Sequence, residues 1–172
     1  MFIFETERLK VRQYNLQDEN EFYQLSGNAE VMRYIRPVVA KTDSDKLLIQ
    51  NIQQYSIYPN TGRWAVFEKS TSNFVGSFSI LVMDSDKNKL HIGYALLPRY
   101  WGQGLASELL RQGISFFFKV HSSDILYAIT EQLNITSQKV LLKCGFFCLG
   151  KQKEGEKEVL IYILKRNENL LE

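Results

Sequence analysis

The sequence predicts an α/β (α+β) protein with a mixed, mostly antiparallel seven-stranded sheet and helices on both of its faces. Strand-like and helix-like segments follow in the order strand, two helices, three strands, helix, strand, helix and two strands. The connections between the three middle strands are short and polar, which is typical of an antiparallel meander. The strand expected at 125–130 is almost wholly apolar, as it should be where both faces of a sheet are covered.

The first half of the chain supplies one strand, two helices and the meander. Residues 9–13 alternate between apolar and polar side chains, as a half-buried strand does. Polar caps at 15–18 and at 43–45 begin two helices, which end near Gly27 and before Pro59. The meander strands are predicted at 63–69, 73–83 and 89–97.

The second half supplies the remaining elements. We predict a largely buried helix at 104–120, the strand at 125–130, a helix from Asn134 to Cys144 and closing strands at 146–149 and 159–164. Gly145 ends the second helix, because a glycine tolerates the left-handed conformation found there. The charged segment 151–158 has the composition of a solvated turn.

Length and composition limit the class of protein. The chain has 172 residues and 45% hydrophobic content, so residues 1–172 are expected to form a single domain with a substantial core. The net charge is only +2 and the basic residues are dispersed, which argues against nucleic acid as a partner. The sequence shows no signal peptide and no membrane span, so we expect a cytoplasmic protein that does not bind membranes. Cys144 and Cys148, with only two histidines, favour free thiols over a metal site.

The segment 99–110 is the most informative part of the chain. Gly102 and Gly104 lie between an apolar strand and the start of a long helix. Such a junction leaves backbone N–H groups free at the positive end of the helix dipole, which suits a phosphate or pyrophosphate. The segment lacks the Gly-Lys-Ser/Thr of a Walker loop and the three-glycine spacing of a dinucleotide fold. A plain helix start with two loop glycines would give a similar pattern.

Four motifs occur in order along nearly the whole chain. They are Glu5-Thr-Glu-Arg-Leu9, then Val75-Gly76, then Ile92-Gly-Tyr-Ala-Leu96 followed by Tyr100-Trp-Gly-Gln-Gly-Leu-Ala106, and finally Asn134-x-x-Ser137-x-x-Val140-x-x-Lys143-x-Gly145-Phe146. Together they resemble the GNAT acyl-CoA N-acyltransferases, in particular the RimJ/RimL-like ribosomal-protein N-acetyltransferase branch. The resemblance implies the acyl-CoA N-acyltransferase fold and transfer of an acetyl group from acetyl-CoA to a primary amine.

The resemblance also implies where acetyl-CoA binds. In the family, loop N–H groups hold the pyrophosphate, and a bulge near the end of the preceding strand frees backbone groups for the pantetheine arm. An asparagine contacts that arm from the other side. The corresponding residues here are Ala95, Leu96, Trp101, Gly102, Gln103, Gly104, Leu105, Ala106, Ser107, Asn134 and Ser137.

The group that protonates the leaving thiolate is the first catalytic question. Many family members use a tyrosine at a position that is Leu141 here, so that tyrosine is absent. The RimL-like branch offers the serine of its Asn-x-x-Ser motif instead, which makes Ser137 the candidate donor. A serine in the first turn of a helix is also often only a secondary cap, and this alternative stays open.

The base that accepts the proton of the amine is the second question. A glutamate between the last two strands has been implicated in the RimL-like branch, and it corresponds to Glu156, with Glu154 as its neighbour. A solvated turn is the alternative for both. His91 stands where the branch usually has Glu, and an imidazole pKa suits a base. Strand alternation, however, places His91 on the face opposite Leu90, and the resemblance favours the Leu90 side for the acceptor.

The acceptor side would be formed by the two early helices and the last hairpin. Candidate residues are Met32, Tyr34, Ile35, Arg36, Tyr55, Tyr58 and Trp64, although Trp64 is better suited to the core. Arg33 and Arg36 could bind an acidic substrate or be merely solvated. The acceptor could be a protein amino terminus or a small amine, such as a polyamine or an amino-sugar antibiotic. A non-catalytic acyl-CoA-binding module and a homodimer both stay open.

Overall fold

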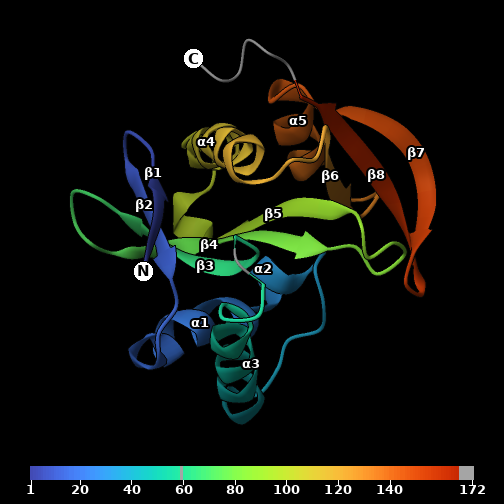
Figure 1. Ribbon diagram of the computed structural model, residues 1–172. Helices are drawn as coiled ribbons and strands as arrows, with labels where there is room; N and C mark the ends of the chain where they lie inside the picture. Colours follow the sequence, from blue (N-terminus) through green and yellow to red (C-terminus); the bar gives the residue numbers. More distant parts are fainter. Residues whose placement is uncertain (59, 167–172) are drawn as a thin grey trace.

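The computed structural model describes residues 1–58 and 60–166 and contains one eight-stranded sheet in the order β1-β2-β3-β4-β5-β6-β8-β7 (Figure 1). The strands are β1 (Phe2–Glu5), β2 (Leu9–Gln13), β3 (Gly62–Glu68), β4 (Phe74–Val82), β5 (Leu90–Leu96), β6 (Ile125–Thr130), β7 (Phe147–Glu154) and β8 (Lys157–Lys165). All neighbouring strands are antiparallel except β5 and β6, which are parallel. This confirms the predicted mixed, mostly antiparallel sheet.

The helices cover the sheet in two layers. Figure 1 shows α1 (Glu19–Ser26), α2 (Ala29–Met32) and α3 (Lys41–Gln54) below the sheet, and α4 (Leu105–Val120) and α5 (Ile135–Lys143) above it. Short 3-10 turns lie at Leu16–Asp18 and Pro98–Tyr100. We call the two faces of the sheet the α3 face and the α4 face.

The sheet has one strand more than the seven predicted. The additional strand is β1, which pairs with β2 at the edge of the sheet. Its sequence Phe-Ile-Phe-Glu is mostly apolar but short, and it lacks the alternation of apolar and polar side chains that predicts a half-buried strand. The four-residue α2 was missed because it is too short to show helical periodicity.

The last two strands are also longer than predicted. The charged segment expected as a turn belongs almost entirely to β7 and β8, and only residues 155–156 turn the chain. Most side chains of β7 are exposed. Backbone hydrogen bonds hold such a ribbon together, so its strands need no apolar alternation.

An aromatic cluster fills the core between the sheet and α4. Trp64 stacks on Phe78 with ring centroids 5.9 Å apart, and Phe116 of α4 meets Trp64 edge-on at 5.9 Å. Gly113 of α4 lies against Phe78, where a larger residue would not fit. Trp64 therefore belongs to the core and not to a pocket, and α4 is fixed at close range above β4 and β5.

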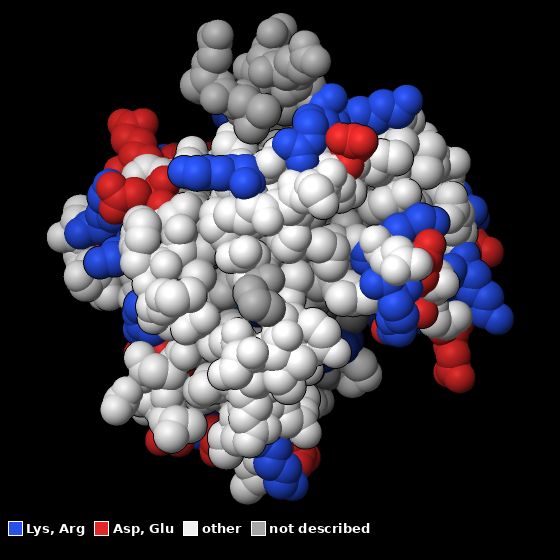
Figure 2. Space-filling model, viewed as in Figure 1, with Lys and Arg blue, Asp and Glu red and all other residues white. Residues whose placement is uncertain are grey.

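Charged side chains lie mainly at the rim of the face shown in Figure 2, with positive and negative groups interspersed. None of the helices formed by the described residues has both the length and the apolar character that crossing a membrane requires. Within the same part of the chain, no group of three or more His, Cys, Asp or Glu residues is arranged to hold a metal ion. Cys144 and Cys148 are free thiols.

Candidate active site

The sheet opens between β5 and β6. These parallel strands pair at only two positions, His91 with Tyr127 and Ile92 with Ala128. Beyond them β5 continues to Leu96 without a partner on this side, although it lies in the middle of the sheet. Gly93, Tyr94 and Ala95 are accordingly only partly buried. The gap therefore widens toward the end of β5 that leads to the glycine loop.

The pairing of β5 with β4 determines which backbone groups of β5 face the gap. That register is unbroken along the whole of β5, so the bulge expected from the resemblance is absent. The Leu97 N–H donates to the Val75 carbonyl at 2.9 Å, and hydrogen-bonded pairs alternate along an antiparallel ladder. By this alternation Tyr94 and Leu96 direct their N–H and C=O groups toward the gap, whereas those of Ala95 point toward β4.

The loop after β5 has the geometry of an anion site. Gly102 and Gly104 both have left-handed backbones, with φ of 72° and 78°. Gly104 is the N-cap of α4, and no side chain in the described part of the chain caps this helix. The first helical N–H groups, from Leu105 to Ser107, thus remain available to a ligand. The positive end of a 16-residue helix adds its dipole at the same place. These features fit the pyrophosphate of acetyl-CoA.

Two side chains of the loop are used to hold its shape. The indole N–H of Trp101 donates to the Leu96 carbonyl at 2.7 Å, and the Gln103 amide donates to the Arg99 carbonyl at 2.7 Å. Trp101 therefore occupies one of the two carbonyls that face the gap. This leaves the N–H groups as the main contribution of the loop to a ligand.

An anchor from the amino terminus fixes the loop from outside, and sequence reasoning did not find it. Glu108 of α4 accepts hydrogen bonds from the Thr6 hydroxyl and from the Arg8 N–H at 2.9 Å. The Arg8 guanidinium pairs with the same carboxylate at 2.7 Å and donates to the Gln103 carbonyl at 3.2 Å. Burial raises the pKa of Glu108, but the hydrogen bonds from Thr6 and Arg8 outweigh it, so the net shift is downward. The Glu5-Thr-Glu-Arg-Leu9 motif was the available signal.

Ser137 lies across the gap from Tyr94. The Asn134 side chain accepts the Ser137 N–H at 3.1 Å and so caps α5. The Ser137 hydroxyl is 3.5 Å from the Tyr94 hydroxyl. Burial raises the pKa of Tyr94, so its hydroxyl keeps its proton at neutral pH. Leu141 is buried in the core. Tyr94 of β5 thus places a phenol next to Ser137. Tyr94 belongs to one of the four sequence motifs, but the sequence alone did not indicate a role for it.

His91 lies on the α3 face. Ile92 contacts the α4 layer at Gly113 and Tyr94 reaches Ser137 of α5, so their neighbour His91 points the other way. Burial, together with the charge of Arg63, lowers the pKa of His91 to about 4. The imidazole is therefore neutral at physiological pH, but it is a weak base.

The two glutamates of the last hairpin lie beyond the closed end of the gap. Glu154 accepts hydrogen bonds from the backbone N–H of Asp84 and from Ser85, in the loop between β4 and β5. Figure 1 shows the same proximity, with the β4–β5 loop next to the turn between β7 and β8. Glu156 is exposed in the turn that follows. The structure does not bring Glu156 to Ser137, and its role as a base stays a prediction.

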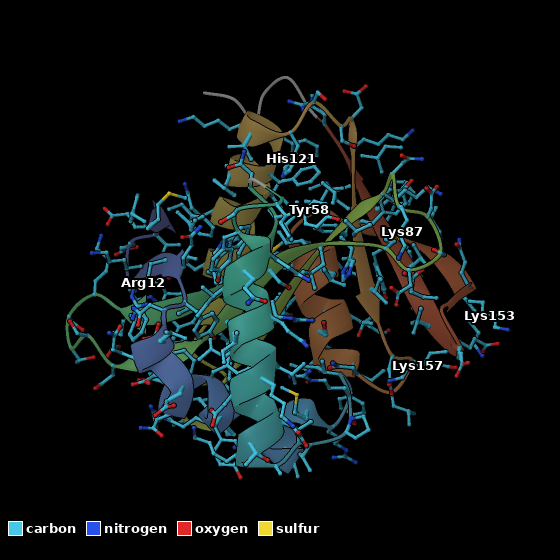
Figure 3. The ribbon with its side chains drawn as sticks, turned by 60° about the horizontal axis from the view of Figure 1, so that its bottom comes forward. Arg12, Tyr58, Lys87, His121, Lys153 and Lys157 are labelled. Carbon is cyan, nitrogen blue, oxygen red and sulfur yellow. The ribbon has the colours of Figure 1, made fainter. Side chains whose placement is uncertain are left out.

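The region expected as the acceptor side lies on the α3 face, where the hairpin meets the early helices, and so on the side of His91 and not on the Leu90 side that the resemblance favours. Lys157 at the start of β8 lies 3.4 Å from both the Ile35 carbonyl and the Glu131 carboxylate. Tyr55 is held by a hydrogen bond from its hydroxyl to the Arg63 carbonyl. Tyr58 is exposed and lies near His121, at the end of α4 far from the glycine loop (Figure 3). Of the aromatic candidates, Tyr55 is thus packed into the α3 face and Tyr58 is remote from the open gap.

Comparison with known proteins decides the family. The profile described as the acetyltransferase (GNAT) domain matches residues 8–147. The chain belongs to the GNAT acetyltransferase family. It is 30% identical over 156 residues to the uncharacterized N-acetyltransferase YoaA of Bacillus subtilis, covering 89% of this chain and 84% of the relative. It is thus an acetyl-CoA-dependent N-acetyltransferase, as the four motifs predicted.

Solved structures of this GNAT fold include members that resemble the chain along almost its whole length. One from Salmonella typhimurium, described as modifying the N-terminal serine of ribosomal protein L7/L12, has a TM-score of 0.81 and 18% identity, with 97% of this chain and 100% of that one covered. The microcin C7 self-immunity acetyltransferase MccE, solved with acetyl-CoA and AMP, has a TM-score of 0.76 and 16% identity, with 93% of each chain covered. The first of these belongs to the branch that the motifs indicate.

Proposed function

We propose that this enzyme transfers an acetyl group from acetyl-CoA to the amino-terminal amine of a protein, with residues 1–172 acting as one domain. The observation that carries the proposal is the meeting of the β5–β6 gap with the uncapped start of α4. The gap is lined by unpaired backbone groups, and the helix start supplies N–H donors. An extended ligand with an anionic end fits both. The four motifs and the likeness to an L7/L12-modifying enzyme support the protein acceptor.

Bound acetyl-CoA supplies the thioester, and the residues of the chain position it. The N–H groups from Gly102 to Ser107 hold the pyrophosphate, and the open-edge groups of Tyr94 and Leu96 align the pantetheine arm. Asn134 lies at the other side of the gap. Holding the thioester and the amine together accounts for much of the rate in such a reaction.

The Ser137 hydroxyl, backed by the Tyr94 phenol, donates to the thiolate that leaves. The two hydroxyls are 3.5 Å apart, so a proton given up by Ser137 can be replaced from Tyr94. This pair takes the place of the family tyrosine that Leu141 replaces. It also argues against a non-catalytic acyl-CoA-binding module, because the absence of that tyrosine was the main reason to consider one.

The proton of the attacking amine leaves to Glu156 through water, or directly to solvent. His91 is less suited, because taking up a proton would place a buried positive charge beside Arg63, whereas Glu156 is exposed. The rate is therefore expected to rise with pH as the amine becomes neutral.

A panel of acceptors tests the proposal. Peptides with different amino-terminal residues, polyamines and aminoglycosides would be incubated with acetyl-CoA while release of CoA thiol is followed. We expect turnover with peptides, and mass spectrometry should place the acetyl group on the terminal amine. Turnover with small amines alone would replace the protein acceptor by a small one. Tight binding of acetyl-CoA with no thiol release from any amine would support the binding module instead.

A further inference from the structure

On the α3 face, two arginines have no ion-pair or hydrogen-bond partner for their side chains among the residues that the structure describes. Four arginines of the chain are half-buried. Arg12 pairs with Asp18 at 2.7 Å, and Arg166 donates to the Phe118 and His121 carbonyls at 2.8 and 2.7 Å. For the other two, Arg63 and Arg36, no ion pair or side-chain hydrogen bond forms with any described residue.

Arg63 lies in the middle of the sheet, next to the gap. It pairs in register with Ser79 of β4, which in turn pairs with Gly93 of β5, so the three share one face. Its neighbour Trp64 is in the core beneath α4, which puts the Arg63 side chain on the α3 face. Arg63 and His91 are close enough for the charge of Arg63 to lower the His91 pKa. Arg63 thus faces the region in which an amine would approach the thioester from the α3 side.

The sheet beside Arg63 is covered by small residues. Ser77, Ser79, Gly93 and Ala95 form two neighbouring cross-strand pairs on the α3 face. Ser77, Gly93 and Ala95 are partly exposed, whereas Phe78, Ile80 and Ile92 on the α4 face are buried. The helices of the α3 face therefore cover Ser79 but leave its neighbours Ser77, Gly93 and Ala95 partly open to solvent, over a floor with little side-chain volume.

Two neighbouring guanidinium groups, those of Arg63 and Arg36, are unfavourable on the α3 face when no described residue neutralises them. The guanidinium of Arg63 lies deep beneath the helices, although part of its side chain touches solvent. Burial lowers its pKa, and the nearby charge of Arg36 lowers it further. Burying a charge costs free energy unless an opposite charge or hydrogen bonds compensate. A guanidinium pairs best with a carboxylate or phosphate, which it binds through two parallel hydrogen bonds.

We propose that the acceptor carries an anionic group, a carboxylate or a phosphate, close to its amine, and that Arg63 and Arg36 bind this group above the small-residue floor of the α3 face. This inference rests on the proposed function, because it concerns the acceptor of that reaction. For a protein acceptor it means an acidic residue next to the terminal amine. The anionic group would hold the amine between Arg63 and the gap, where the thioester is expected.

Matched pairs of amines test the inference. The pairs are Ser-Asp and Ser-Asn peptides with amidated ends, β-alanine and its amide, and phosphoethanolamine and ethanolamine, compared by kcat/KM at equal concentrations of neutral amine. We expect the acidic member to be preferred by about tenfold or more in at least one pair. The pair that shows the preference distinguishes a peptide carboxylate, a free carboxylate and a phosphate. Equal rates within every pair would overturn the inference and leave the acetyltransferase intact.

Variants assign the preference to the two arginines. Arg63→Gln and Arg36→Gln should each lower kcat/KM for the acidic amine about tenfold and leave the neutral amine within about threefold, so the preference is lost. Arg63→Lys should keep part of it. Lys46→Gln is the control, because Lys46 is an exposed cation of α3 that pairs with Asp43 and lies outside the proposed site. An equal loss for both members of a pair would assign Arg63 a structural role instead and overturn the inference.

A measurement without turnover separates this inference from the proposed function. With CoA bound, so that the glycine loop is filled, inorganic phosphate should raise the melting temperature of the wild type but not of Arg63→Gln. No thiol release from any amine, together with this protection by phosphate, would remove the proposed function and keep the anion site. Equal protection of both proteins would remove the anion site alone.

Discussion

Gly104 is the residue on which the proposed pyrophosphate site depends most directly. Its φ of 78° lies in the left-handed region, where a β-branched side chain is strained. A Gly104→Val substitution should rotate the loop N–H groups away from their ligand. We expect acetyl-CoA binding, measured by calorimetry, to weaken at least about tenfold, or about 1.4 kcal/mol.

Gly150→Val is the control for that substitution. Gly150 also has a positive φ, of 105°, and no heavy atom beyond its chain neighbours lies within 4 Å of the position that a Cβ would take, but it belongs to β7. It carries the same kind of backbone strain without touching the loop. Unchanged acetyl-CoA affinity in Gly104→Val would show that the pyrophosphate lies elsewhere.

Ser137 and Tyr94 should act as a pair. We expect Ser137→Ala to lower kcat more than it weakens acetyl-CoA binding, since the proposed role of the hydroxyl is to donate to the leaving thiolate. Tyr94→Phe should lower kcat less, and the double variant should lose little beyond Ser137→Ala, because Tyr94 acts through Ser137. Steady-state kinetics of the four proteins measure this. Additive losses would separate the two residues, and a wild-type kcat in Ser137→Ala would remove that serine from the mechanism.

His91 should make stability depend on pH. Its pKa is about 4 in the folded protein against 6.5 when exposed, so between these values the unfolded chain binds more protons. The free energy of unfolding should therefore fall as pH falls from 6.5 to 4, by up to roughly 3 kcal/mol. Arg63 favours the neutral form, while Glu154 and Asp84 oppose it.

His91→Gln should remove that part of the pH dependence. Denaturant unfolding of both proteins at several pH values gives the difference, and His121, whose pKa burial also lowers, is present in both and cancels. Identical pH profiles would mean that His91 is not buried as the structure has it.

At the scale of elements, the turn between β1 and β2 holds the start of α4. The Arg8–Glu108 pair is partly exposed, with 45% and 19% of the two side chains accessible, so we expect its rupture to cost only about 1 kcal/mol of stability. Its larger effect should fall on the loop, since Arg8 also binds the Gln103 carbonyl. Arg8→Gln should weaken acetyl-CoA binding about threefold to tenfold.

Lys46→Gln provides the comparison for Arg8→Gln. It breaks an exposed ion pair with Asp43 in α3, away from the loop. Calorimetric affinity and melting temperature should change little in this control. Equal small effects in both variants would reduce the anchor to an ordinary surface contact.

The elements predicted well are those whose signals are local. The helices α4 and α5 and the strand β6 combine apolar runs with glycine boundaries, and their predicted limits agree with the structure to within about a residue. β1 and the charged parts of β7 and β8 were not predicted. An edge strand and an exposed ribbon need few buried side chains, so their sequences lack the alternating pattern of a half-buried strand. These strands pair through backbone hydrogen bonds, and backbone groups are nearly the same in every sequence, so the pairing leaves no pattern of side chains to recognise.

In the candidate site, too, the parts that could be predicted are those with a local signal in the sequence. The glycine loop and the Asn134–Ser137 turn could be predicted because their spacing is contiguous. Tyr94 could not be paired with Ser137 from the sequence, since the two meet only when α5 packs beside β5. That Arg63 has no side-chain partner among the described residues depends on which residues the fold places around it, and no local sequence pattern predicts this.

On the scale of the whole molecule, the sheet consists of two parts. The strands β1 to β5 form one part and β6, β8 and β7 the other, and between them lie only the two residue pairs at His91 and Ile92. The contact of Glu154 with the β4–β5 loop adds a second link. A ligand in the gap would touch both parts.

Acetyl-CoA should therefore stabilise the protein as a whole. A ligand at a hundred times its dissociation constant adds about 2.7 kcal/mol to the free energy of unfolding. We expect a melting temperature that rises with acetyl-CoA concentration, and slower amide hydrogen exchange in β5 and β6 as well as in the loop. Protection confined to the loop would show that the arm does not enter the gap.

The short pairing of β5 and β6 has a consequence for the life of the protein in a cell. In the proposed binding mode the pantetheine arm lies where the backbone hydrogen bonds between β5 and β6 are missing. The unliganded protein would then have a weak boundary there, at which proteases can act once it opens. Degradation by proteases follows the population of such open states when opening is fast. The abundance of this enzyme would then follow the supply of acetyl-CoA, and a cell short of acetyl groups would lose the enzyme along with its substrate.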